Sequence, residues 1–167
     1  MRGSIFVKPE TCMGCKRCEL ACALAHAGSQ DLYQAIHESP SPRSRVDVDR
    51  LGGFNVPLQC RHCENAQCVT VCPTGAMKRL GREGPVVVDH DLCVGCRSCT
   101  IVCHFGVPRM DESGKVLIKC DLCIERLDRG QEPACVSACP TKALCFVAAP
   151  TTERTGTFIE RFAQASR

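Results

Sequence analysis

The apolar positions of this chain form short runs, and turn-forming residues separate them. Runs typical of short β-strands occupy residues 5–7, 86–88, 115–118 and 144–148. Gly81 and Gly84 lie between the apolar residues of 76–80 and those of 86–88, so we expect a β-hairpin there. No apolar run approaches the length that a membrane-spanning helix needs. The pattern therefore predicts small strands and hairpins.

Two other segments carry helical patterns. Residues 31–37 are predicted to form a short helix with Asp31 near its N-terminal cap, and residues 45–48 a strand. In residues 155–167 a predicted helix has one apolar side, made by Phe158, Ile159 and Phe162. We expect this helix either to fold back on its own domain or to dock on a partner.

Cysteine dominates the composition, with 17 cysteines in 167 residues. Such a density indicates either the disulfide scaffold of a secreted protein or a set of metal sites. Residues 1–8 hold no apolar stretch of signal length, so we expect thiolates in a reducing compartment, the cytoplasm. The chain has no tryptophan and only 4% aromatic residues, so its small core needs stabilisation by metal. We therefore expect the apoprotein to be largely unstructured.

Sixteen of the cysteines form four groups of four, and Cys145 stands outside them. The first and third groups have the compact spacing C-x2-C-x2-C-x3-C, the second has a middle gap of four residues, and the fourth a middle gap of eleven. In chain order the groups are Cys12, Cys15, Cys18 and Cys22; Cys60, Cys63, Cys68 and Cys72; Cys93, Cys96, Cys99 and Cys103; and Cys120, Cys123, Cys135 and Cys139.

This spacing is typical of 4Fe–4S clusters in bacterial two-cluster ferredoxins, where the fourth cysteine of one group ligates the cluster of another. Four groups predict four clusters. Short helices bearing each group's fourth cysteine are predicted after Cys18, Cys68, Cys99 and Cys135. Zinc is an alternative for the fourth group, because a long middle gap also suits a zinc site, whereas three near-adjacent thiolates surround one small ion only with strain. Cys145 is expected to be a buried small hydrophobe on a strand rather than a ligand or a redox sensor.

The formal charge of +3 changes when clusters are counted. Sixteen thiolates around four cores of charge +2 give the holoprotein a net charge of about −5. Many of the 21 Lys and Arg residues are then expected to be counter-charges to the clusters, and no basic run exceeds Lys16-Arg17. Nucleic-acid binding is not expected. Each cysteine group is complete, so the histidines are expected in solvent or beside the ligands.

With the groups in this order, the chain resembles, over nearly its whole length, the four-cluster electron-transfer subunits whose type member serves dimethyl sulfoxide reductase. Segments 32–37 and 42–46 and the short length resemble two smaller types within that group. These are the ferredoxin subunit of carbon monoxide dehydrogenases and the small subunit of tungsten aldehyde oxidoreductases. Similar proteins also serve hydrogenases and formate dehydrogenases. The resemblance implies an α+β fold of two tandem bacterial-ferredoxin-like modules.

The resemblance also implies which cysteines share a cluster, because the family pairs the first group with the fourth and the second with the third. The implied ligand sets are Cys12, Cys15, Cys18 and Cys139 (set 1); Cys120, Cys123, Cys135 and Cys22 (set 2); Cys60, Cys63, Cys68 and Cys103 (set 3); and Cys93, Cys96, Cys99 and Cys72 (set 4). Ala23 and His104 stand where such groups often carry proline, which is a departure from the family pattern.

The expected modules follow from these sets. Residues 1–24 with 104–150 form one module that holds two clusters, and residues 55–103 form the other. Residues 25–54 are a connector, which either packs the modules together or docks a partner, and residues 151–167 are a C-terminal tail.

The sequence offers no nucleophile–base pair, phosphate-binding loop or dinucleotide fingerprint, so the protein is not expected to be an enzyme on its own. The resemblance implies an electron-transfer subunit that relays electrons to or from a catalytic tungsten, molybdenum or nickel–iron subunit of an oxidoreductase of anaerobic metabolism. For the aldehyde oxidoreductase type, the resemblance also implies that copies of the subunit stack on one another. Direct membrane insertion is not expected. A free, diffusing polyferredoxin is the alternative.

Overall fold

The computed structural model describes residues 2–81, 84–111, 113–114 and 117–149. Its strands pair into four two-stranded antiparallel sheets, β1–β8, β2–β3, β4–β5 and β6–β7. The strands are β1 (Arg2–Val7), β2 (Val46–Leu51), β3 (Phe54–Gln59), β4 (Met77–Arg79), β5 (Val86–Val88), β6 (Arg109–Met110), β7 (Leu117–Ile118) and β8 (Leu144–Ala149). The helices are η1 (Pro9–Thr11), α1 (Arg17–Ala25), α2 (Leu32–Ala35), α3 (Gln67–Thr70), α4 (Ser98–Ile101), α5 (Ile124–Asp128) and α6 (Ala134–Ser137). The predicted α+β class, with short hairpins, short helices and little regular structure, is confirmed.

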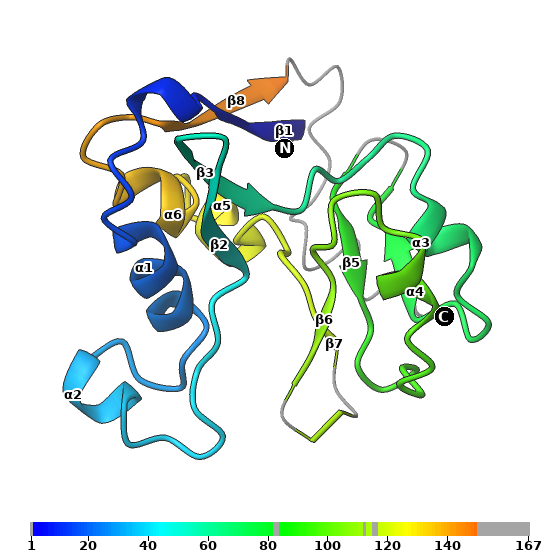
Figure 1. Ribbon diagram of the computed structural model, residues 1–167. Helices are drawn as coiled ribbons and strands as arrows, with labels where there is room; N and C mark the ends of the chain where they lie inside the picture. The colour runs from blue at the N-terminus through cyan, green and yellow to red at the C-terminus, as the bar shows by residue number, and fades with distance from the viewer. Residues whose placement is uncertain (1, 82–83, 112, 115–116, 150–167) are drawn as a thin grey trace.

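The first lobe joins the two ends of the described chain. Strand β1 pairs with β8, with Ile5 opposite Phe146 and Val7 opposite Leu144 (Figure 1). Ile5 and Leu144 face a core that also holds Leu122 and Val136. Helix α1 packs against α6 beneath this sheet. This packing places the first and fourth cysteine groups in one core, although about a hundred residues separate them.

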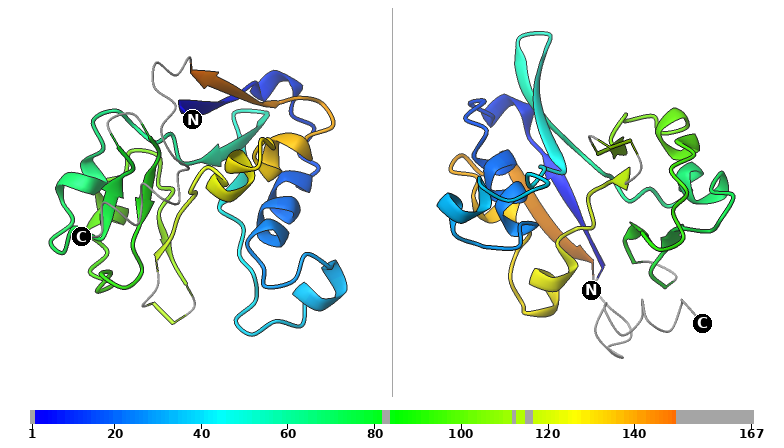
Figure 2. Two further views of the ribbon diagram at one scale, coloured as in Figure 1. Left: turned by 180° about the vertical axis from the view of Figure 1, so that it is seen from behind. Right: turned by 90° about the horizontal axis from the view of Figure 1, so that it is seen from below.

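The second lobe contains α3, α4 and the β4–β5 hairpin, and both views of Figure 2 set it beside the first. Its core is Met77, Val86 and Leu117, against which Met110 and several cysteines pack. A smaller group of hydrophobic side chains joins the lobes, because Ile124 of α5 packs against residues of the β4–β5 hairpin. The polypeptide runs from β7 into α5 across this junction.

Several sequence predictions are confirmed. Residues 77–79 and 86–88 form the predicted hairpin, and Gly81 has a φ of 66° in its turn. The predicted strands at 5–7 and 144–148 are present in longer form as β1 and β8. Helix α2 begins after Asp31, whose side chain accepts a hydrogen bond of 3.0 Å from the Gln34 N–H.

The predicted strand at 45–48 is half of a hairpin that the sequence did not suggest. Strand β2 pairs with β3, in which Pro57 lies opposite Val48. A proline is unfavourable inside a sheet, but β3 has only one partner strand, so an N–H on its other side is not needed for the ladder. Gly52 and Gly53 both have positive φ and form its two-residue turn.

The prediction that each group's fourth cysteine lies on a helix is correct only for Cys22 in α1. Helices α3, α4 and α6 are single turns that end before Cys72, Cys103 and Cys139. Cys145 lies on β8 as predicted, but it is half-buried and its Sγ donates to the Lys142 carbonyl oxygen over 3.1 Å. A strand beside solvent on one face buries only alternate residues, and Leu144 takes the buried position.

Two hairpins lie across the expected module limits. Strand β3 begins one residue before position 55, and β6–β7 follows position 104 but packs in the second lobe through Met110 and Leu117. The predicted helix around Phe158, Ile159 and Phe162 lies outside the described residues. Among the described residues, no helix has the length and apolar character needed to cross a bilayer.

Candidate metal centres

Left-handed backbone shapes the compact cysteine loops. In the first loop Gly14 and Lys16 have φ of 71° and 57°, and in the third Gly95 and Arg97 have φ of 68° and 64°. Such conformations are unfavourable for a lysine or an arginine, so the surrounding loop must impose them. The shared pattern Cys-x-Gly-Cys-Lys/Arg thus presents the cysteines of both loops in the same way.

Set 2 lies inside the first lobe, and all four of its cysteines are buried. Burial raises the pKa of the Cys123 thiol to about 12, and Cys22 acts in the same direction. The pKa of Cys135 is also raised by burial and by the charges of Cys22 and Cys123. Cys22 of the first group is therefore a close neighbour of the fourth group. Thiols this deeply buried stay protonated unless a metal supplies positive charge.

Set 1 borders the same core. Cys18 is buried, and burial raises its pKa to about 11, with Glu19 and Cys12 adding to the rise. Cys12 and Cys139 pack against the core that contains Cys18, and Cys15 is exposed. This end of the first lobe thus reaches the surface.

Sets 3 and 4 lie in the second lobe. Burial raises the pKa of Cys68, and the charges of Cys60, Cys103 and Cys63 add to the rise, so Cys103 of the third group lies among the second. The four cysteines of set 4 line one cavity, whose apolar wall includes Met77, Met110 and Leu117. Four sulfur ligands around an apolar cavity are the donor set that a 4Fe–4S cluster requires.

The chain matches the family described as "4Fe-4S dicluster domain" twice, over residues 52–149 and over residues 11–77. It belongs to this family. The two matches together contain all sixteen grouped cysteines, and this member of the 4Fe–4S dicluster family carries four 4Fe–4S clusters. Zinc at the fourth group is thereby excluded.

Relatives of this dicluster protein include the "Iron-sulfur protein" of Rhodospirillum rubrum, 41% identical over 155 residues that cover 86% of this chain and 80% of the relative. An anaerobic dimethyl sulfoxide reductase chain of Escherichia coli (strain K12) is 36% identical over 146 residues, 84% of this chain and 71% of the relative. The protein is a member of the family of iron–sulfur electron-transfer subunits to which that reductase chain belongs. A solved structure, "Active site complex BamBC of Benzoyl Coenzyme A reductase as isolated", is similar at a TM-score of 0.44 and 23% identity, with 98% of this chain and 87% of that chain covered.

The sequence Cys-Pro-Thr-x-Ala follows the helix in two of the cysteine groups and places hydrogen-bond donors around the fourth cysteine of each. The Met77 N–H lies 3.4 Å from Cys72 Sγ, and the Thr74 hydroxyl lies 3.8 Å from it. Backbone hydrogen bonds lower the pKa of Cys72 although burial opposes them, and the pKa of Cys139 is lowered in the same way. These donors stabilise the thiolate form that binds iron.

The first group carries Ala23 instead of proline, and there a residue distant in sequence donates a hydrogen bond to the fourth cysteine, Cys22. The Arg45 N–H lies 3.3 Å from Cys22 Sγ. The Arg45 side chain forms an ion pair of 2.6 Å with Asp121, and Asp121 accepts a hydrogen bond of 2.9 Å from the Cys123 N–H. Arg45 therefore ties the segment before β2 to both groups that contribute to set 2.

His26 completes this network. Its Nε2 lies 3.2 Å from Asp121, and its Nδ1 lies 2.7 Å from the Cys22 carbonyl oxygen. Burial opposes protonation, but the hydrogen bonds to Asp121 and Cys22 raise the pKa of His26 to about 9. Burial opposes ionisation of Asp121, but His26, Arg45 and the Cys123 N–H hold the pKa of Asp121 well below its usual range. His26, Asp121 and Cys123 also approach one another closely enough to hold a metal ion, but Cys123 belongs to set 2.

Sequence reasoning missed Arg45, Asp121 and Lys119 as parts of the site. Asp121 lies between two cysteines of the fourth group, in Cys120-Asp121-Leu122-Cys123, and Lys119 directly precedes them. The positions of Asp121 and Lys119 beside these cysteines were a signal, but the partners of both residues are distant in sequence.

Proposed function

We propose that the protein relays single electrons as the iron–sulfur subunit of an oxidoreductase complex whose catalytic subunit is a tungsten, molybdenum or nickel–iron enzyme. The observation that carries this proposal is the presence of four groups of four cysteines in one small protein of the same family as the dimethyl sulfoxide reductase chain. Each cluster supplies one-electron transfer when bound. The protein makes or breaks no substrate bond, and its reduced thiolates suit the cytoplasm.

We assign the cysteines to sets 1 to 4 as the family resemblance implies, and the electrostatic interactions between sets support a linear order. The charge of Cys18 acts on Cys135, which relates set 1 to set 2. Cys60 acts on Cys120 across the two lobes, which relates set 2 to set 3. Cys68 acts on Cys99, which relates set 3 to set 4. Electrons therefore pass along the order 1, 2, 3, 4 or its reverse.

The module division is proposed on the same basis. Residues 1–24 with 104–150 supply sets 1 and 2, and residues 55–103 supply sets 3 and 4 apart from the packing of the β6–β7 hairpin. Residues 25–54 connect the two modules.

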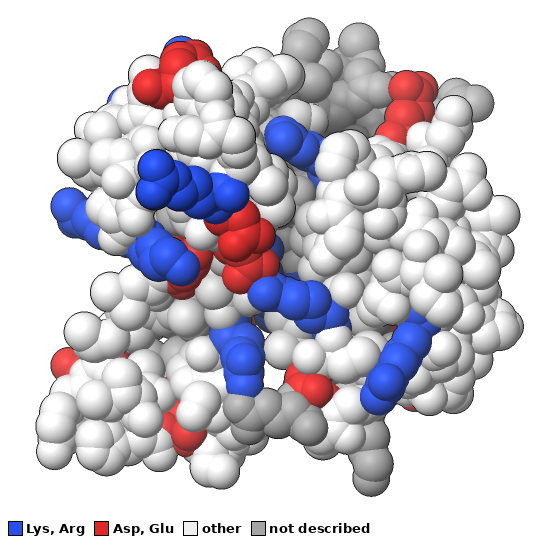
Figure 3. Space-filling view, in the orientation of Figure 1, with Lys and Arg blue, Asp and Glu red and all other residues white. Residues whose placement is uncertain are grey.

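Both ends of this line reach the surface through apolar side chains. Met13, in the loop of set 1, is 63% exposed, and Val94, in the loop of set 4, is 68% exposed. Ile101 on α4 is 82% exposed. On the face in Figure 3, charged side chains gather over the first lobe, whereas the second lobe carries few. Apolar rims beside a redox centre suit contact with a protein partner.

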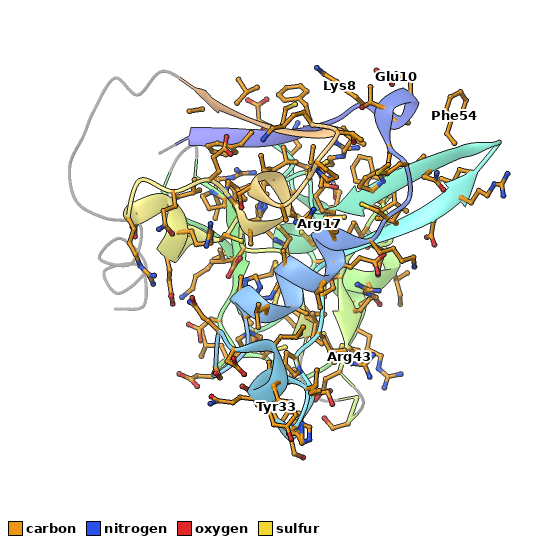
Figure 4. The ribbon with its side chains drawn as sticks, turned by 90° about the vertical axis from the view of Figure 1, so that its left-hand side faces the viewer. Lys8, Glu10, Arg17, Tyr33, Arg43 and Phe54 are labelled. Atoms are coloured by element: carbon orange, nitrogen blue, oxygen red, sulfur yellow. The ribbon has the colours of Figure 1, made fainter. Side chains whose placement is uncertain are left out.

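The connector offers a further apolar surface. Tyr33 on α2 is 72% exposed and Phe54 at the tip of β2–β3 is 54% exposed, and Figure 4 shows them at separate places on one side of the molecule. Two separated apolar sites fit a subunit that touches more than one neighbour, including a second copy of itself.

Purification from the native host tests the proposal. A tagged copy is isolated without oxygen, and its mass is measured under native conditions together with its tungsten, molybdenum and nickel content. We expect a hetero-oligomer that contains a larger metalloenzyme and about sixteen iron per copy of this protein. A lone monomer of 18.2 kDa that exchanges electrons with many acceptors would instead identify a diffusing polyferredoxin. Reduction of dyes by a small substrate with this protein alone would contradict the electron-transfer role.

A further inference from the structure

Lys119 is a buried cation at the junction of the two lobes. It lies between β7 and the fourth cysteine group, where the polypeptide crosses from one lobe to the other (Figure 1), and it is only 3% exposed. Lysine is almost never fully buried unless its charge is compensated.

The compensation does not come from a carboxylate. The Lys119 Nζ donates to the Val86 carbonyl oxygen of β5 and, over 2.9 Å, to the Cys120 carbonyl oxygen. Among the residues that the structure describes, Lys119 forms no ion pair with Asp or Glu. An ammonium satisfied only by neutral carbonyl groups in the interior is unfavourable by several kcal/mol unless an anion lies close by.

The Lys119 ammonium lies between residues of two different sets: Cys120 of set 2 supplies one of its carbonyl acceptors, and Cys68 of set 3 packs against the core that contains Val86, which supplies the other. Burial raises the pKa of Cys120 in set 2 and of Cys68 in set 3, Asp121 raises that of Cys120 further, and the charge of Lys119 lowers both. Cys60 of set 3 also acts on Cys120, so the two sets approach each other here.

Two other ionisable groups lie at this junction, and neither is a second cation for the two sets. The Val86 N–H donates to His62 Nδ1 over 3.1 Å, and burial together with Lys119 lowers the pKa of His62 to about 3, so its ring is neutral. The charge of Asp121 opposes that of Lys119, since it raises the pKa of Cys120, and Asp121 forms ion pairs with Arg45 and His26. Lys119 is therefore the cation that both sets share.

We propose that Lys119 is the common counter-charge of sets 2 and 3 and raises the reduction potentials of both clusters. The inference rests on the proposed ligand sets. Four thiolates around a core of charge +2 give a net negative site, and an added electron makes it more negative. A buried ammonium favours the reduced form, since attraction between charges is strong where water is excluded.

Potentiometry followed by electron paramagnetic resonance tests this role. Lys119→Met removes the charge with little change in volume, and Lys119→Arg keeps it. Arg129→Met is the matched control, because Arg129 is an exposed cation in an i,i+4 pair with Glu125. In the Met variant we expect two of the four potentials to fall, with the ratio of reduced to oxidised cluster at a fixed solution potential dropping tenfold or more, equivalent to about 59 mV. The Arg variant and the control should stay near the native values.

Iron and sulfide analysis of each variant keeps the result unambiguous. If Lys119→Met retains about sixteen iron and all potentials are unchanged, the proposal is wrong. If it loses clusters, Lys119→Arg decides: a full complement with native potentials supports the counter-charge, and the same loss in the Arg variant assigns Lys119 a packing role only. These measurements need no partner enzyme, so their failure is distinct from failure of the proposed complex.

Discussion

Replacing Leu144 with alanine tests whether the core of the first lobe holds the clusters in place. Leu144 is 0% exposed and packs among Ile5, Leu122 and the cysteine ligands of sets 1 and 2. Burial of a leucine side chain contributes about 1.5–3 kcal/mol, and the cavity left by alanine brings the cost to about 2–5 kcal/mol. Neighbouring cysteines tied to iron limit any collapse around the cavity, so we expect about 4 kcal/mol, which changes the unfolding equilibrium by about a thousandfold.

The measurement is an anaerobic urea titration followed by circular dichroism and by the visible absorbance of the clusters. With a urea m-value of about 1–3 kcal/mol per molar, the Leu144→Ala midpoint should fall by more than about 1 M. Leu51→Ala is the matched control, because Leu51 is also a strand leucine but is 53% exposed. Its stability should change by less than about 0.5 kcal/mol. Equal midpoints for the two variants would refute the view that this core retains the clusters.

Two further predictions concern the clusters themselves. Cys22→Ser should alter the resonance signal of the cluster that we assign to Cys120, Cys123 and Cys135, because the charge of Cys22 acts on Cys123 and Cys135, whereas Cys145→Ser should leave all four signals unchanged. A change confined to the cluster of the first group would contradict the crossed ligand sets. Removal of iron with a strong chelator should abolish most of the circular dichroism of the folded protein, since the buried thiols form much of its core. An apoprotein with native-like spectra would show that the polypeptide folds without metal.

Local patterns determined the strands and the helix cap that the sequence predicted correctly. The turn at Gly81 and the cap at Asp31 depend on residues within a few positions of each other, so a single sequence records them. The β2–β3 hairpin escaped prediction because Pro57 is unfavourable in a strand in general, yet harmless where only one partner strand is present. The helix ends before Cys72, Cys103 and Cys139 escaped because single-turn helices have no periodicity to extrapolate.

The sequence by itself determined the number of the clusters and the grouping of the cysteines, because thiolates must follow one another at short fixed intervals to wrap a cluster. Only the tertiary structure decided what surrounds them. Arg45 meets Asp121 across 76 positions, and Lys119 meets Val86 across 33. Neither contact can be predicted from neighbouring residues, since the charge of a side chain does not indicate its partner before the polypeptide folds. The chemistry of the clusters is therefore local, whereas the electrostatic environment that tunes them depends on the whole fold.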